Sequence, residues 1–228
     1  MKFMFDCDDT LYNCQQPFIK AVETVLPELL KMDISSLYDL YRKKGDEMFD
    51  SIQDGSLNPY TAGIYRILNT LKDIQIDIPY SKAETFQKIY KENQYRIQMD
   101  PEFKEYLINH KHQYAILTNG ENNHQRNKCK ALQVEDFVDP LNIFTSGQIG
   151  YAKPDVRAFH KVLEAMNEKS EDWYYIGDNY KNDMEGAKKA GLKTIHFNRH
   201  HTLEGPCSDY VVYSELELMK LMDTFNRF

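Results

Sequence analysis

Residues 1–11 read MKFMFDCDDTL, a mostly apolar start that runs directly into a cluster of acids. The first five residues predict a short buried strand, after which Asp6 and Asp8 stand one residue apart. Side chains at positions i and i+2 of an extended segment point the same way, and sites in open parallel sheets lie beyond the carboxyl ends of the strands. The stretch therefore predicts paired carboxylates at a sheet edge, although such an acidic run is also common in solvated turns.

The composition is that of a globular protein with a substantial core. The chain has 228 residues, 42% of them hydrophobic, and a formal charge of -7, which gives no general attraction for nucleic acid. Its apolar runs are far shorter than the roughly 20 residues that span a bilayer, and its first residues lack a signal-peptide pattern. The four cysteines form no Cys-x-x-Cys pair, which favours free thiols. We expect a cytoplasmic protein with no membrane or nucleic-acid polymer as partner; the sequence leaves the oligomeric state unknown.

From about residue 99 the pattern alternates between helix and strand. Asp100 followed by Pro101 predicts a helix start, and Gly191 predicts a helix end. Alternating strands and helices imply right-handed crossovers and a parallel sheet covered on both faces. We therefore expect an α/β fold with a doubly wound, Rossmann-like parallel sheet that includes the N-terminal strand. Its other strands are predicted at residues 114–117, 143–144, 173–176, 194–197 and 210–213.

Residues 14–98 follow a different pattern. Apolar residues recur there every three or four positions, which predicts amphipathic helices, and Pro59 and Pro79 separate the helical segments. We expect four or so helices forming a compact bundle. The predicted organisation is a catalytic α/β core of residues 1–13 and 99–228 with an all-helical cap domain, residues 14–98, inserted between its first strand and the rest.

Polar groups follow several of the predicted strands in an order that one mechanism would need. Because the carboxyl ends of parallel strands meet at one edge of a sheet, these groups are expected to converge there. They are Asp6 and Asp8, then Thr118 and Asn119, then Lys153, and finally Asp178 with Asp183 five residues later.

This series of motifs resembles the haloacid dehalogenase superfamily of phosphohydrolases over essentially the whole chain. The matching residues are Asp6-Cys7-Asp8-Asp9-Thr10, Thr118, Lys153, and Gly177-Asp178 through Asp183. The resemblance implies a Mg²⁺-dependent phosphatase with a helical cap of the C1 type. It also implies a metal site made by Asp6, the backbone carbonyl of Asp8, and Asp178, with Asp183 in support.

The chemistry of these residues leads to the same interpretation. A carboxylate can attack phosphorus to form an aspartyl-phosphate, a role that we assign to Asp6. Asp8 is expected to act first as general acid and then as general base. Thr118 and Asn119 are expected to bind phosphoryl oxygens, and Lys153 to neutralise charge in the transition state. Mg²⁺ and Lys153 are expected to keep Asp6 anionic, which leaves Asp8 to exchange the proton.

The motif that begins at Asp6 limits the classes of substrate that we expect. Asp8 argues against the dehalogenases of the superfamily, which attack carbon and do not use this second aspartate as a proton donor. Asp9-Thr10-Leu11 resembles the nucleotidase-like and sugar-phosphatase-like branches more than the phosphoglucomutase branch. We expect hydrolysis of a small phosphorylated metabolite, a nucleoside monophosphate or a sugar phosphate. A phosphomutase of the β-phosphoglucomutase type and a non-catalytic phosphometabolite-binding protein remain alternatives.

Overall fold

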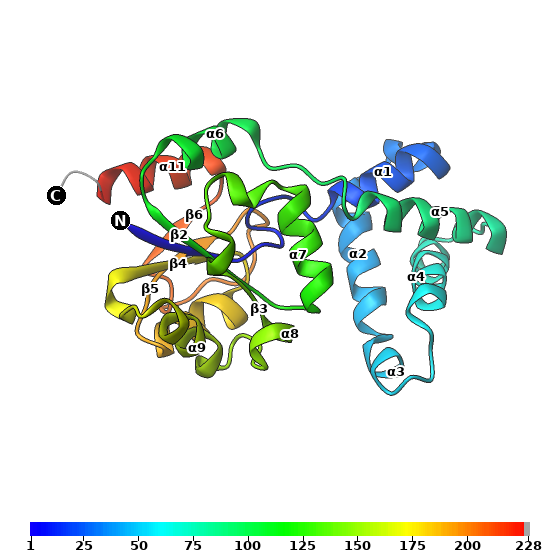
Figure 1. Cartoon of the computed structure of the whole chain (residues 1–228). Helices are drawn as coiled ribbons and strands as arrows, with labels where there is room; N and C mark the ends of the chain where they lie inside the picture. The colour runs from blue at the N-terminus through cyan, green and yellow to red at the C-terminus, as the bar shows by residue number, and fades with distance from the viewer. Residues whose placement is uncertain (226–228) are drawn as a thin grey trace. The chain divides into compact units, whose positions relative to one another are not determined.

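The computed structural model describes residues 1–225 and forms two compact units (Figure 1). One unit joins Met1–Asn13 to the chain from Gln98 onward, and we call it the α/β unit. The other unit is Cys14–Ile97, and we call it the helical unit.

Strands and helices alternate along the α/β unit. The strands are β1 (Lys2–Phe5), β2 (Gln113–Thr118), β3 (Ile143–Thr145), β4 (Trp173–Gly177), β5 (Lys193–Phe197) and β6 (Tyr210–Val212). The α-helices are α6 (Pro101–Asn109), α7 (Asn122–Ala131), α8 (Ser146–Ile149), α9 (Val156–Met166), α10 (Gly186–Lys189) and α11 (Glu215–Thr224). Short 3-10 helices cover Val134–Asp136, Pro140–Asn142 and Ser170–Asp172, and a π-helical turn covers Tyr180–Glu185.

The six strands form one sheet in the order β3-β2-β1-β4-β5-β6, with every neighbouring pair parallel. This confirms the predicted doubly wound parallel sheet. The chain crosses to one side of β1 through β2 and β3, and to the other through β4, β5 and β6. Phe5 at the end of β1 is in register with Ile116 of β2 and Ile176 of β4. The residues after β1 therefore lie at the point where the strand order reverses, which is where open α/β sheets carry their sites.

Alternate residues of β1 face opposite layers of helices. Met4 belongs to the buried cluster that contains Phe159 of α9, whereas Phe5 lies on the other face, with its ring centroid 6.2 Å from that of Phe103 in α6. All four side chains are fully buried. Burial of side chains of this size contributes about 1.5–3 kcal/mol each, so packing on both faces fixes the end of β1 firmly.

Two helix starts in the α/β unit can be compared with the sequence. The start at Asp100 is as predicted, and the start after β4 is not. The Asp100 side chain accepts a hydrogen bond from the Phe103 N–H at 2.9 Å, as expected for a helix cap. After β4, the polar residues Asn182 and Asp183 predict that a helix begins at one of them, and this prediction is wrong. The Asn179 side chain accepts from the Asn182 N–H at 3.0 Å, so the turn begins earlier and is π-helical before α10 begins.

The helical unit consists of α1 (Gln16–Val25), a 3-10 helix (Pro27–Lys31), α2 (Ile34–Asp46), α3 (Phe49–Gln53), α4 (Pro59–Asp73) and α5 (Tyr80–Asn93). Helix α5 packs against α1 and α4, and α4 packs against α2. The core contains Phe18, Tyr41, Ile67 and Phe86, all fully buried. The helical spacing of the aromatic residues in this segment predicts that they fill the bundle core. Tyr41 does so, but the prediction is wrong for Phe49, Tyr60 and Tyr65, which are exposed.

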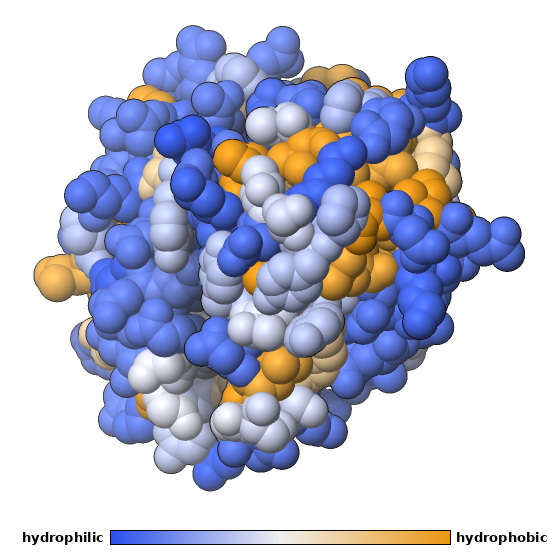
Figure 2. Space-filling model, turned by 90° about the vertical axis from the view of Figure 1, so that its right-hand side faces the viewer, coloured by the Kyte–Doolittle hydropathy of each residue, from blue (hydrophilic) through white to orange (hydrophobic). Residues whose placement is uncertain are grey.

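Figure 2 shows one face of the molecule, on which hydrophobic residues gather in patches bordered by hydrophilic ones. Within residues 1–225, no helix combines the length and the apolar character needed to cross a bilayer. The four cysteines are free thiols, as expected, and Cys7 and Cys129 are buried.

Candidate active site

Asp6 continues directly from β1, and the chain then turns sharply. The Asp6 N–H donates to the Ile176 carbonyl at 2.8 Å, which extends the pairing of β1 with β4 by one residue. Asp9 has a φ of 55°, in the left-handed region that aspartate tolerates better than most residues. The Leu11 N–H donates back to the Cys7 carbonyl at 3.0 Å. This compact turn holds Asp6 and Asp8 at the sheet edge.

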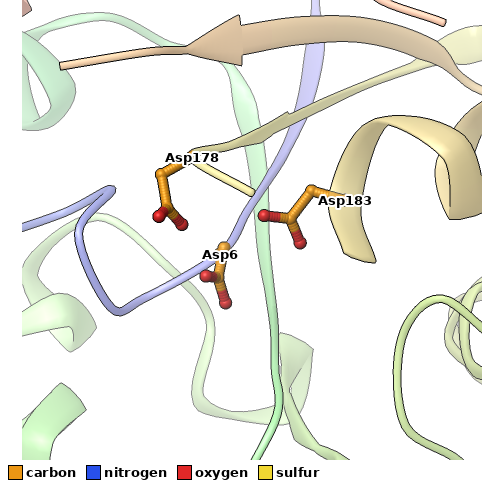
Figure 3. Close-up of side chains that lie close together, drawn as sticks. All are labelled: Asp6, Asp178 and Asp183. Carbon is orange, nitrogen blue, oxygen red and sulfur yellow. The ribbon is translucent and has the colours of Figure 1, made fainter. Parts of the chain in front are cut away.

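Three carboxyl groups converge beyond the ends of β1 and β4 (Figure 3). One oxygen each of Asp6, Asp178 and Asp183 lies within 4.8 Å of the others. Asp6 follows β1, Asp178 follows β4, and Asp183 is on the π-helical turn. We predicted four residues for the metal site. The structure brings the carboxylates of three of them close together. Asp8, the fourth, was expected to contribute its backbone carbonyl.

The backbone around Asp178 is held from two sides. The Asn179 N–H donates to Asp183 Oδ2 at 2.9 Å, and the ring Nε2 of buried His196 lies 2.9 Å from the Asp178 carbonyl oxygen. A Cβ on Gly177 would lie 2.5 Å from Asp183 Cγ. Glycine at this position is therefore what allows Asp183 to approach so closely. Sequence reasoning missed His196, which alternates within β5 like an ordinary strand residue.

Lys153 joins two of the acids. Its buried Nζ lies 2.8 Å from Asp6 Oδ1 and 2.6 Å from Asp183 Oδ1, and it donates to the Tyr175 hydroxyl at 2.7 Å. Tyr175 in turn donates to the Leu117 carbonyl at 2.9 Å. Burial alone would lower the pKa of Lys153, but Asp183 and Asp6 raise it well above its usual 10.5. Lys153 is thus a permanent cation beside Asp6.

Thr118 is the last residue of β2, and Asn119 follows it directly. The side chains of these two residues have different surroundings. Thr118 is buried at the last position of the strand. The side-chain amide of Asn119 pairs with the backbone of Lys153 in both directions: its Oδ1 accepts from the Lys153 N–H at 2.8 Å, and its Nδ2 donates to the Lys153 carbonyl at 2.9 Å. The Asn119 side chain therefore positions Lys153, and the predicted contact of Asn119 with a phosphoryl oxygen stays a prediction.

Asp8 is surrounded by groups that the sequence reasoning did not identify. Lys128 Nζ lies 2.8 Å from both Asp8 oxygens, the Tyr12 hydroxyl donates to Oδ1 at 2.7 Å, and Gln125 Nε2 donates to Oδ2 at 3.1 Å. Gln125 and Lys128 are three residues apart on α7, the helix that follows Thr118. Their spacing on one face of that helix was the available signal.

From the sequence, Asp6 is expected to be anionic and Asp8 to exchange the proton. The groups of the protein alone shift the pKa values of these two carboxyls in the opposite order. Burial, opposed by Lys153 and reinforced by Asp183, raises the pKa of Asp6 to about 7. Burial would also raise the pKa of Asp8, but the charge and hydrogen bonds of Lys128 lower it below its usual 3.8. Burial, together with Asp183 and Asp6, raises the pKa of Asp178 well above that value.

The charges of the acidic cluster bear on the kind of ion that fits. Three carboxyl groups lie close together and the ammonium of Lys153 pairs with two of them, so the cluster retains an excess of negative charge when it is ionised. A divalent cation would relieve that repulsion. The donors are all oxygen, which suits a hard cation such as Mg²⁺ and not a soft one. The residues present therefore fit the predicted metal.

Comparisons with known proteins agree with this geometry. A family model described as haloacid dehalogenase-like hydrolase matches residues 3–197, more than half of the chain. The chain is 26% identical over 241 residues to a glyceraldehyde 3-phosphate phosphatase of Pyrococcus furiosus, covering 98% of this chain and 92% of that protein. It is 34% identical over 92 residues to a phosphoserine phosphatase of Thermus thermophilus, covering 40% and 36%. A HAD-hydrolase of Bacillus subtilis, solved bound to magnesium, has the same fold, with a TM-score of 0.68 at 20% identity over 97% of this chain and 98% of that one.

Proposed function

Because the chain belongs to the haloacid dehalogenase-like hydrolase family, we propose that it is a Mg²⁺-dependent phosphatase that hydrolyses small phosphomonoesters through an aspartyl-phosphate on Asp6. One observation carries the proposal: Asp6 lies against Lys153 within a group of three carboxylates, at the edge of the sheet where the strand order reverses. The full-length match to a curated phosphatase supports the reaction class.

The proposed metal ligands are the carboxylates of Asp6 and Asp178 with the backbone carbonyl of Asp8, and Asp183 supports them. Bound there, Mg²⁺ would favour the anionic form of Asp6 and offset the charge of the phosphoryl group. Asp183 is fully buried, and its two oxygens accept from Lys153 and from the Asn179 N–H. Its role is therefore to orient the metal ligands.

In the first half-reaction, an Asp6 oxygen attacks phosphorus and the bond from phosphorus to the ester oxygen breaks. Lys153, 2.8 Å from Asp6, and the Thr118 hydroxyl are suited to stabilise the phosphoryl oxygens. Asp8 gives its proton to the departing alkoxide. The negative charge of an entering phosphate raises the proton affinity of Asp8 and so opposes the effect of Lys128.

In the second half-reaction, water replaces Asp6 on phosphorus. Asp8, now ionised, removes a proton from that water, and the bond between the Asp6 carboxyl oxygen and phosphorus breaks. Inorganic phosphate leaves and Asp6 is regenerated. The hydrogen bonds from Lys128, Tyr12 and Gln125 keep the Asp8 carboxylate in one orientation for both proton transfers.

The substrate class that we propose is a small phosphorylated metabolite. The curated relatives act, by their names, on glyceraldehyde 3-phosphate and phosphoserine. Sugar phosphates and nucleoside monophosphates are the leading candidates from the sequence. We propose that the helical unit is the cap that excludes water and selects the leaving group, and that the protein acts in the cytoplasm.

The test is phosphate release from a panel of esters by the full chain, with and without Mg²⁺. The panel contains glyceraldehyde 3-phosphate, phosphoserine, a hexose phosphate, a nucleoside monophosphate and p-nitrophenyl phosphate. We expect turnover of at least one ester that depends on Mg²⁺ and is lost in Asp6→Asn. Asp172→Asn is the matched control, because this exposed aspartate precedes β4 instead of following it.

Three outcomes would contradict the proposal. Turnover retained in Asp6→Asn would remove Asp6 from the role of nucleophile. Binding of an ester with Mg²⁺ present but no phosphate release from the whole panel would favour the binding-protein alternative. Isomerisation of a sugar phosphate without phosphate release would favour the mutase.

A further inference from the structure

The helical unit contains a cavity of about 290 Å³. All of its lining residues belong to Cys14–Ile97, and none is among the groups of the acidic site. The volume is at the lower end of the roughly 300–1,000 Å³ of small-molecule sites. The rings of Tyr41 and Tyr90 and the side chains of Met48 and Ile52 give the cavity apolar walls.

Two buried polar atoms in the cavity lining have no hydrogen-bond partner within the described part of the chain. They are the hydroxyl of Tyr41, which is fully buried, and Oε1 of Gln87, whose residue is 2% exposed. A buried acceptor without a donor destabilises a fold. The two unpaired atoms therefore lower the stability of the folded chain. A ligand that supplies the missing donor or acceptor would restore that stability.

The cavity also has an excess of positive charge. Arg66 and Lys91 line it, and neither forms an ion pair with any residue between 1 and 225; the acid in the lining is exposed Asp46. Arg66 Nε donates to the Tyr41 carbonyl at 2.6 Å, and its guanidinium carbon lies 3.8 Å from the centroid of the Tyr41 ring. These contacts hold the guanidinium in place, so it is arranged in advance for an anion.

Two glycines inside helices make room for the polar groups of the cavity. A Cβ on Gly45 of α2 would lie 2.8 Å from Arg66 Cζ, and a Cβ on Gly63 of α4 would lie 2.2 Å from Gln87 Cδ. Neither glycine has a positive φ, so the backbone does not require glycine at either position. Glycine weakens a helix interior. Gly63 lies within α4, so that helix is weakened where the Gln87 side chain lies against it, whereas Gly45 is in the last turn of α2.

We propose that this cavity is a second binding site, separate from the acidic site, for a small organic acid with an aromatic or branched apolar body. The carboxylate of the ligand pairs with Arg66 and Lys91. Its apolar body packs against Tyr41 and Tyr90. An N–H or O–H of the ligand donates to Gln87 Oε1.

The first test compares three probes by calorimetric titration of the full chain. Indole-3-acetate has the carboxylate, the flat apolar body and an N–H donor. Indole lacks the carboxylate, and 1-methylindole-3-acetate lacks the donor. We expect indole-3-acetate to bind, and each of the other two to bind at least about tenfold more weakly. Equal affinities for all three probes, or no binding of indole-3-acetate, would overturn the proposal.

The second test assigns each contact to its residue. Gln87→Met should weaken indole-3-acetate about tenfold but leave 1-methylindole-3-acetate unchanged, because only the first probe donates to Oε1. Its melting temperature should equal or exceed that of the wild type, since an unpaired buried oxygen is removed. Lys91→Gln should weaken both acids, whereas Lys88→Gln, one turn away and outside the lining, should weaken neither.

A further variant separates this site from the proposed catalytic one. Asp6→Asn should bind indole-3-acetate with the affinity of the wild type. Loss of binding in Asp6→Asn, or equal affinities of wild type and Gln87→Met for indole-3-acetate, would place the probe outside this cavity and overturn the proposal.

Discussion

Replacement of Lys128 by methionine should destabilise the α/β unit and impair the proposed proton transfers. Lys128 Nζ lies 2.8 Å from both oxygens of Asp8, and the two side chains are 10% and 33% exposed. A hydrogen bond to a charged group contributes about 1.5–3 kcal/mol, whereas an exposed ion pair contributes about 0.2–1 kcal/mol. Because Asp8 is one-third exposed and keeps its bonds to Tyr12 and Gln125, we expect a loss of about 1–2 kcal/mol. For a chain of this size, each kcal/mol lowers the melting temperature by about 2–4 °C.

The loss should depend on pH in a defined direction. Lys128 lowers the pKa of Asp8 in the folded chain below its usual 3.8. The stability that this pair contributes is therefore complete above that value and disappears as the pH falls through the lower folded-state pKa. The difference between wild type and Lys128→Met should be constant near neutral pH and shrink in strong acid.

The assay is urea unfolding followed by tryptophan fluorescence. Trp173 is the single tryptophan of the chain and is fully buried in β4, so it reports on the α/β unit. The matched control is Lys161→Met, which removes an exposed lysine whose ion pair with Glu164 has its two side chains 53% and 72% exposed. We expect the control to change stability by less than about 0.5 kcal/mol. We also expect the kcat of Lys128→Met to be about tenfold lower than that of the wild type, or lower still. Equal losses of unfolding free energy in the two variants, or a smaller fall in kcat, would refute the argument.

Three further predictions concern the acidic cluster. Asn119→Ala removes both hydrogen bonds that hold the Lys153 backbone and should lower kcat about tenfold or more, measured by steady-state phosphate release. Gly177→Ala places a Cβ 2.5 Å from Asp183 Cγ and should cost about 1–3 kcal/mol in urea unfolding, together with a weaker response of activity to added Mg²⁺. Because burial raises the pKa of Asp6 to about 7, protons should compete with the metal, so the Mg²⁺ concentration for half-maximal activity should rise as the pH is lowered from about 8 to about 6.

Much of the fold could be predicted because its signals are local. Short apolar runs gave the strands, and their alternation with helices gave the parallel sheet, which the structure confirms. The motifs indicated the family, which the family-model match confirms. The π-helical turn could not be predicted, because it differs from an α-helix only in its backbone hydrogen bonds, and the Asn179 cap that starts it is an ordinary polar residue.

The site was predicted where the chemistry follows the motifs and missed where it depends on packing. The structure places Asp6, Lys153 and Asp178 together beyond the strand ends. Lys128 was missed because helical spacing gives a face of α7 but not what that face contacts. Tyr175 was counted only as a strand residue, since the contact of its hydroxyl with Lys153 depends on the register between strands. The catalytic roles, the metal and the substrate stay predictions.

The central claim is that Asp6 becomes phosphorylated during turnover. The most direct measurement is mass spectrometry of peptides from the full chain, quenched in acid while it turns over an active ester with Mg²⁺ present. We predict one added phosphoryl group on the peptide that contains Asp6, and none on that peptide in Asp6→Asn. Turnover with the phosphoryl group on a different residue, or the same label on Asp6→Asn, would contradict the account.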